Sequence, residues 1–131
     1  MGQGVGAPRP VEVPGLGPTG PAWSQVTVAS GLVFVSGQVA WNEDGEVIGA
    51  SVTEQTEAVF ENLRTALEGA GSSMRNLARI CVYLTDPADI AGFREVRDRW
   101  LDGIRPASTL LIVSALADPA LLVEVDATAT L

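Results

Sequence analysis

The stretch SQVTVASGLVFVSGQVAW (residues 24–41) decides the fold, because two runs rich in valine flank one turn signal. The turn signal is Ala29-Ser30-Gly31, and β-branched runs on either side of such a turn predict a β-hairpin. A second turn follows over residues 42–49, with Asp44-Gly45 at its tip. The first half of the domain is therefore expected to build part of a sheet.

A helix is predicted directly after this hairpin, over residues 51–70. Ser51 and Glu54 have the spacing of a capping box at its start. Apolar residues then recur at helical intervals until Gly69 and Gly71 end the pattern. This helix is amphipathic and needs an apolar surface to pack against.

A strand over residues 78–85 and a second helix follow. Asp89 is expected to cap this helix, which has an apolar stripe along one side. The stripe consists of Ile90, Phe93, Val96, Trp100 and Leu101. Residues 108–116 and 121–131 predict the last two strands. The element order predicts an α+β domain with two helices on one face of a mixed or antiparallel sheet of about six strands.

Two strands are apolar on both of their alternating faces. These are LVFV (32–35) and LLIV (110–113). Because two helices can cover only one face of the sheet, we expect an apolar patch on the other face, which needs a partner. A second copy of the same chain is the simplest partner, so the sequence predicts a homo-oligomer.

Charge and composition exclude several classes of function. The chain has 8 basic and 16 acidic residues, a net charge of −8, and no histidine. Such a charge disfavours binding to nucleic acid or an anionic membrane, so we expect neither as a partner. The absence of histidine removes the commonest general base and most zinc sites, and we expect no metal.

The N-terminal composition, the short apolar runs and the single cysteine predict a cytoplasmic protein. Residues 1–21 are rich in glycine and proline and are expected to form a flexible arm before a domain over 22–131. They contain no apolar core of a secretory signal, and the longest apolar run, over 110–117, is too short for a membrane helix. The single cysteine, Cys81, allows no internal disulfide and is expected to be a small buried residue.

The ordered set of motifs along the chain resembles the RidA (YjgF) family. The motifs are WSQ (23–25), GLVFVSGQ (31–38), EQT…ENL…AGSS (54–73), VYLTD (82–86), PAxxxLxxSxL (106–116) and VEVDA (123–127). The resemblance implies a chorismate-mutase-like fold and a homotrimer whose sheets form a central barrel. It also implies small-molecule pockets at the subunit interfaces, no cofactor, and hydrolysis of reactive enamines and imines to 2-oxo acids and ammonia.

The same resemblance assigns roles to particular residues. Glu124 matches the family glutamate that orders the attacking water. The carboxylate-binding arginine of the family falls at position 108, which is serine here, and Arg105 lies three residues earlier. Trp23 stands where the family has a tyrosine. A serine cannot hold a carboxylate by charge, so these differences favour a larger and less acidic substrate.

The predicted site combines catalytic and substrate-binding residues. We expect Glu124, Ser108 and Thr109 to carry the catalytic chemistry. Substrate binding is expected from Trp23, Arg105, Leu110, Ile112 and Trp41.

Three functions remain open from the sequence. The first is acid/base chemistry on a small imine, enamine or carbonyl intermediate, by hydrolysis, cyclisation or condensation, in specialised metabolism for example. The second is the standard imine deaminase reaction, with Arg105 in place of the family arginine. The third is a trimer that binds a small molecule or stabilises a partner without catalysis. Ribonuclease activity fits poorly with the negative charge and the absence of histidine.

Overall fold

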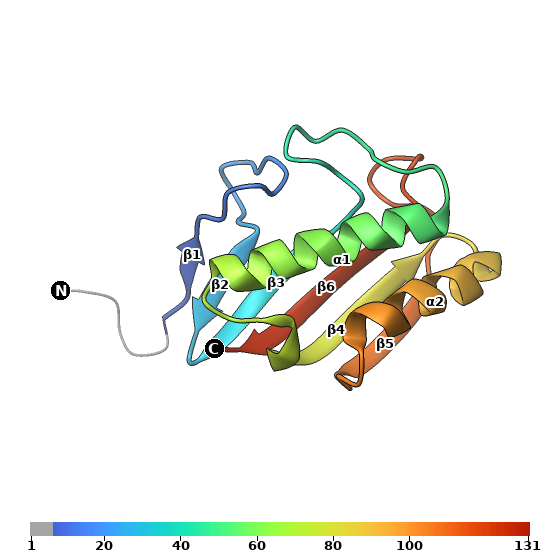
Figure 1. Ribbon diagram of the computed structural model, residues 1–131. Helices are drawn as coiled ribbons and strands as arrows, with labels where there is room; N and C mark the ends of the chain where they lie inside the picture. The colour runs from blue at the N-terminus through green and yellow to red at the C-terminus, as the bar shows by residue number, and fades with distance from the viewer. Residues whose placement is uncertain (1–6) are drawn as a thin grey trace.

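Two helices lie across one face of a six-stranded sheet in the computed structural model, which describes residues 7–131 (Figure 1). The strand order is β1-β2-β3-β6-β4-β5, and every neighbouring pair is antiparallel except β4 and β5. The strands are β1 (Arg9–Val11), β2 (Val26–Ala29), β3 (Leu32–Gln38), β4 (Leu77–Leu84), β5 (Ala107–Ile112) and β6 (Val123–Thr130). The helices are α1 (Val52–Gly69) and α2 (Ile90–Leu101), with short 3-10 turns at Met74–Asn76 and Pro87–Asp89. This arrangement confirms the predicted α+β class and the mixed sheet.

The predicted hairpin and first helix form as expected. Ser30 and Gly31 both adopt positive φ angles, 51° and 76°, in the tight turn between β2 and β3. At the start of α1, the Ser51 side chain accepts a hydrogen bond from the Glu54 amide, and the Glu54 side chain accepts one from the Ser51 amide. This capping box fixes the first turn of α1.

The start of the second helix differs from the prediction. Asp89 makes no side-chain capping bond, and instead Asp86 accepts a hydrogen bond from the Ala88 amide at 2.9 Å. The chain enters α2 through a 3-10 turn, so Asp89 already has helical backbone angles rather than the extended ones of a capping residue. The cap therefore moves three residues towards the N-terminus.

The described part of the expected arm belongs to the domain. Arg9–Val11 pairs with β2 as an edge strand, and Leu16 is buried in the core. The edge of β2 supplies hydrogen-bond partners for this segment, which has no strand periodicity of its own. Residues 1–6 of the expected arm lie outside the described residues.

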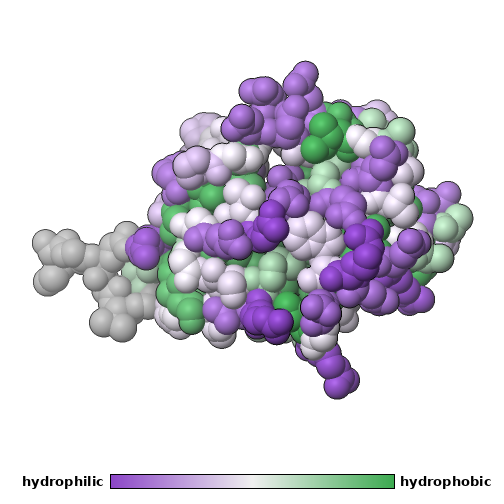
Figure 2. Space-filling view, in the orientation of Figure 1, coloured by the Kyte–Doolittle hydropathy of each residue, from purple (hydrophilic) through white to green (hydrophobic). Residues whose placement is uncertain are grey.

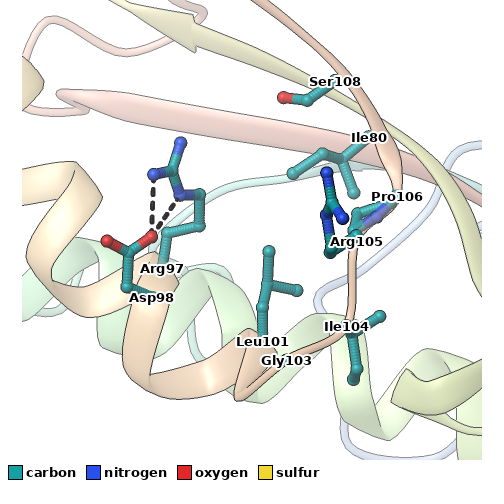
Figure 3. A pocket seen from close by; sticks show the side chains of 9 residues that line it. All are labelled: Ile80, Arg97, Asp98, Leu101, Gly103, Ile104, Arg105, Pro106 and Ser108. Carbon is teal, nitrogen blue, oxygen red and sulfur yellow. Dashed lines mark hydrogen bonds and ion pairs between the residues drawn. The ribbon is translucent and has the colours of Figure 1, made fainter.

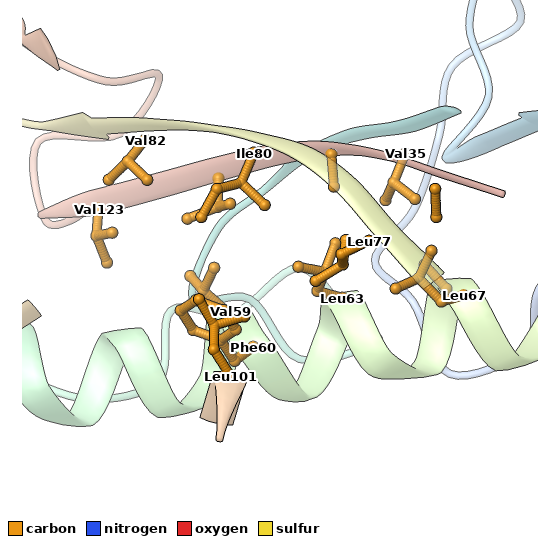
Figure 4. Packing of buried hydrophobic residues seen from close by; sticks show 14 of the residues in the cluster. Val35, Val59, Phe60, Leu63, Leu67, Leu77, Ile80, Val82, Leu101 and Val123 are labelled. Atoms are coloured by element: carbon orange, nitrogen blue, oxygen red, sulfur yellow. The ribbon is translucent and has the colours of Figure 1, made fainter. Parts of the chain in front are cut away.

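The core fills the space between the sheet and the two helices (Figure 4). In β6 the alternate residues Val123, Val125 and Ala127 are buried beneath the helices, as their period-two pattern predicts. The outward face of the helices is largely polar, with scattered apolar patches (Figure 2). Within residues 7–131, no helix combines the length and the apolar character needed to cross a bilayer.

The face of the sheet that points away from the helices is less apolar than the sequences of β3 and β5 alone suggest. Phe34 and Leu111 are exposed there, 41% and 49% respectively. Polar residues of β4 and β6 lie between them in register. These are Arg79, Cys81, Tyr83, Glu124, Asp126 and Thr128. This open face is therefore a mixture of apolar and ionisable side chains, with exposed apolar residues on β3 and β5.

A buried glutamine connects the helix layer to the start of β6. Gln55, which is 1% exposed, accepts a hydrogen bond from the Leu122 amide and donates to the carbonyls of Ala120 and Gly49. These bonds hold the loop before β6 against the first turn of α1. They therefore fix the position at which Glu124 enters the sheet.

Replacing Gln55 by leucine is expected to lower the free energy of unfolding by about 2–4 kcal/mol, because three backbone groups lose the hydrogen-bond partner that the buried Gln55 side chain supplies. Urea denaturation measures this difference. Glu68→Gln, on the exposed side of the same helix, serves as the control and should change stability by less than about 0.5 kcal/mol. Equal stability of Gln55→Leu and the wild type would contradict this role.

Candidate functional site

A pocket of about 200 Å³ lies beside the sheet where β3 ends and β6 begins. The segment before β2, the end of β3, the loop before β6 and one residue of α1 all contribute to it. The lining residues are Gly17, Trp23, Gln25, Gly37, Gln38, Val39, Trp41, Asn62, Ala117, Leu121 and Glu124. This pocket is the candidate functional site because two tryptophan side chains and a partly buried carboxylate, that of Glu124, line it together.

That side chain is Glu124, the second residue of β6. The alternation that buries Val123 and Val125 turns Glu124 to the open face, where it is partly buried. Within residues 7–131, its carboxylate takes part in no ion pair or side-chain hydrogen bond. Burial, together with the negative charge of Asp126, raises the pKa of Glu124 above its ordinary value. A carboxyl group of this kind exchanges protons closer to neutral pH than a solvated one does.

Gly37 makes room for this carboxylate. A Cβ atom at position 37 would lie 2.7 Å from Cδ of Glu124 and closer still to Oε2. The pairing of β3 with β6 shifts register between Val35 and Gln38, so Gly37 lies in a bulge. Sequence reasoning missed this residue, although a glycine inside a predicted strand is itself a signal for a bulge or a close approach.

Two indole rings form much of the apolar lining. Trp23 is 47% exposed at the rim, and Trp41 is partly buried, with an Nε1 atom that has no hydrogen-bond partner in the described part of the chain. Val39 and Leu121 add aliphatic surface. Of the predicted site residues, the structure thus brings Trp23, Trp41 and Glu124 together.

Ser108 and Arg105 lie at a different cavity, of about 410 Å³, between the start of β5 and α2 (Figure 3). Ser108 pairs with Ile80, whose side chain is buried beneath the helices, so Ser108 lies on the helix side of the sheet. Arg97 also borders this cavity and forms an ion pair with Asp98 at 2.7 Å. Within one chain, Arg105 and Ser108 are therefore separate from the pocket of Glu124.

The other predicted residues of β5 are also outside the pocket. Thr109 lies on the open face and accepts a hydrogen bond from Arg79 at 2.9 Å. Leu110 packs against the main core, and Ile112 is 43% exposed on the edge strand. These three residues do not meet Glu124 within a single chain.

Asp126 and Tyr83 form a second polar group on the open face. The Tyr83 hydroxyl donates to Oδ2 of Asp126 at 2.9 Å. This hydrogen bond, with burial and the charge of Asp126, raises the pKa of Tyr83 to about 12. The tyrosine therefore stays protonated and keeps its donor on Asp126.

The described residues contain no group of three or more cysteine or acidic side chains arranged to hold a metal ion.

Comparison with known proteins gives consistent matches over most of the chain. A family model described as endoribonuclease L-PSP matches residues 17–131. A RutC family protein of Pyrococcus abyssi is 35% identical over 113 residues, which make up 86% of this chain and 87% of that protein.

Solved structures match the same fold. The crystal structure of yeast Mmf1 has a TM-score of 0.90 and 27% identity, covering 95% of this chain and 98% of that one. RidA from the Antarctic bacterium Psychrobacter has a TM-score of 0.87 and 27% identity, covering 94% and 99%.

The contact between Gly37 and Glu124 can be tested by a double-mutant cycle. Gly37→Ala should lower the free energy of unfolding by about 1–3 kcal/mol, because the added methyl group overlaps the carboxylate. In a Glu124→Ala background the same change should cost much less, because the overlapping atoms are gone. Equal costs in both backgrounds would show that Gly37 does not accommodate Glu124.

Proposed function

Because the chain belongs to the RidA (YjgF) family, whose family model is described as endoribonuclease L-PSP, we propose that it is an enzyme acting on an imine, enamine or carbonyl intermediate. The observation that supports this best is the partly buried carboxylate of Glu124, unpaired among residues 7–131, in a pocket that Trp23 and Trp41 also line. A buried carboxylate without a partner lowers stability, so a fold that retains one is a candidate for chemistry at that position.

In the proposed reaction Glu124 transfers a proton in both directions. Its carboxylate accepts a proton from water as the water oxygen forms a bond to the imine carbon. That proton goes to nitrogen and gives an intermediate with a hydroxyl and an amino group on the same carbon. Glu124 then passes the hydroxyl proton to nitrogen, the carbon–nitrogen bond breaks as the C=O bond forms, and the products are a carbonyl compound and ammonia. The raised pKa of Glu124 suits both steps, because the group is easily protonated and easily deprotonated. Cyclisation or condensation at the same carbon would need the same proton transfers.

We further propose that the site is completed in a homotrimer. β5 is an edge strand whose far side has no partner strand within residues 7–131, and Leu111 and Ile112 are exposed along it. Trp23, at the rim of the pocket, is also exposed. In the assembly, the start of β5 from a neighbouring subunit, with Ser108 and Thr109, would face the pocket of Glu124.

The alternative is the standard deaminase reaction with Arg105 as the carboxylate-binding residue. The observation in its favour is that Arg105 is exposed and borders the same cavity as Ser108. In this alternative, Arg105→Ala would weaken the reaction of 2-imino acids specifically. In the favoured proposal, Arg105→Ala has little effect on turnover.

Glu124→Gln is expected to reduce turnover at least about 100-fold while the assembly stays intact, because the amide cannot exchange a proton. The assay measures ammonia released from imines generated in situ, by an amine oxidase from amines and by an amino-acid oxidase from amino acids. Sedimentation measures the assembly. Glu95→Gln, on the exposed side of α2, is the matched control and should retain full activity.

Unchanged turnover in Glu124→Gln would exclude the acid/base role. Ligand-induced stabilisation without turnover of any imine would favour a non-catalytic binding protein on the same scaffold.

A further inference from the structure

The amide and carboxyl side chains in the pocket of Glu124 offer hydrogen-bond acceptors to a ligand, and a neutral donor, Nε1 of Trp41, is unpartnered there among residues 7–131. Gln38 uses its side-chain amide group as a donor to Oε1 of Gln25 at 2.8 Å and to the Ser36 carbonyl at 3.0 Å. Asn62 likewise donates to the carbonyls of Val39 and Trp41, at 3.1 and 3.0 Å. Because carbonyl oxygens can only accept, these contacts fix which end of each amide is nitrogen.

The remaining amide donor in the lining is also in use. The Gln25 amide group donates to the Gly17 carbonyl at 3.1 Å. The side-chain oxygens of Gln38 and Asn62 accept no hydrogen bond among residues 7–131, and both residues line the pocket. Together with the carboxylate of Glu124, they present acceptors to a ligand.

The charge in the pocket is negative and has no compensating cation in the described chain. All eight basic residues of the sequence are arginines, and none of them lines this pocket. Arg79 is bonded to Thr109, and Arg105 lines the other cavity. Asp126, two residues beyond Glu124 on the same face, adds a second negative charge nearby. A carboxylate group on a ligand would therefore meet repulsion and no donor of opposite charge.

The apolar part of the pocket has the lining and the volume to hold a ligand with an aromatic or cyclic ring. Trp23 and Trp41 present indole surfaces, and indole faces attract cations. An engineered cavity of about 150 Å³ in another protein takes up benzene. A pocket of about 200 Å³ therefore has room for one six-membered ring with a polar group attached.

We propose that this pocket selects a ligand with an aromatic or cyclic body and a cationic N–H donor group, and without a carboxylate. A protonated imine or amine fits this description, its N–H groups donating to Glu124 and to the side-chain oxygens of Gln38 and Asn62. This inference rests on the proposed function only in placing the substrate in this pocket, and it specifies the class of substrate.

The test compares three probes of similar shape on the assembled full-length protein: benzylammonium, benzyl alcohol and benzoate. Their dissociation constants are measured by titration calorimetry, with quenching of tryptophan fluorescence as a second readout. Benzylammonium should bind at least about tenfold more tightly than benzoate, because one ligand meets an opposite charge and the other a like charge. Benzyl alcohol should fall between them.

Glu124→Gln should weaken benzylammonium binding about tenfold and leave benzyl alcohol unchanged, because only the charge is removed. Glu95→Gln is the control and should alter none of the three constants. Equal binding of all three probes, no binding of any, or tighter binding of benzoate would overturn the inference. If tighter benzoate binding disappears in Arg105→Ala, the guanidinium of a neighbouring subunit supplies the missing cation.

These experiments distinguish failure of the proposed ligand class from failure of the proposed enzyme activity. Selective benzylammonium binding without turnover of any imine would support the ligand class and reject the enzyme. Turnover that depends on Glu124, together with a preference for benzoate, would reject the ligand class and support the enzyme.

Discussion

The coverage of only one face of the sheet by the two helices is the constraint on which the rest of the structure depends. It divides β6 into two sets of side chains, because successive residues of a strand point to opposite faces. Val123, Val125 and Ala127 enter the core, and Glu124 and Asp126 are left on the open face. The position of the candidate site therefore follows from the burial of its neighbours.

A carboxylate in this position lowers stability, and the surrounding structure holds it there. Gln55 fixes the loop that leads into β6 from beneath α1, and the bulge at Gly37 leaves space above the strand. The side-chain amides around the pocket are fixed by backbone carbonyls, so they cannot turn to donate to Glu124. The carboxylate remains available to a ligand or to water because its neighbours are already engaged.

Much of the fold was predictable because its signals are local. The capping box of Ser51 and Glu54, the turn at Ser30-Gly31 and the alternation of VEVDA each depend on residues close in sequence. The face on which Ser108 lies was not predictable, because LLIV is apolar on both faces and only the register with Ile80 decides it. The contact of Gly37 with Glu124 joins residues far apart in the chain, and β1 forms only because β2 offers it an edge. Trp23 and Glu124 were expected at the site because of the resemblance to the RidA (YjgF) family, and the structure places both with Trp41 in one pocket.

The central claim is that Glu124 is a partly buried carboxyl group without a compensating charge. A carbon-13 NMR titration of its side-chain carboxyl group, in the assembled protein, tests this most directly. The midpoint should lie above the ordinary pKa of a glutamate side chain. The folded protein would then hold the proton more tightly than the unfolded chain, and stability would fall as pH rises between the ordinary pKa and the raised one. A midpoint at or below the ordinary value would mean that a cation or hydrogen-bond donor already satisfies Glu124, and would contradict the account.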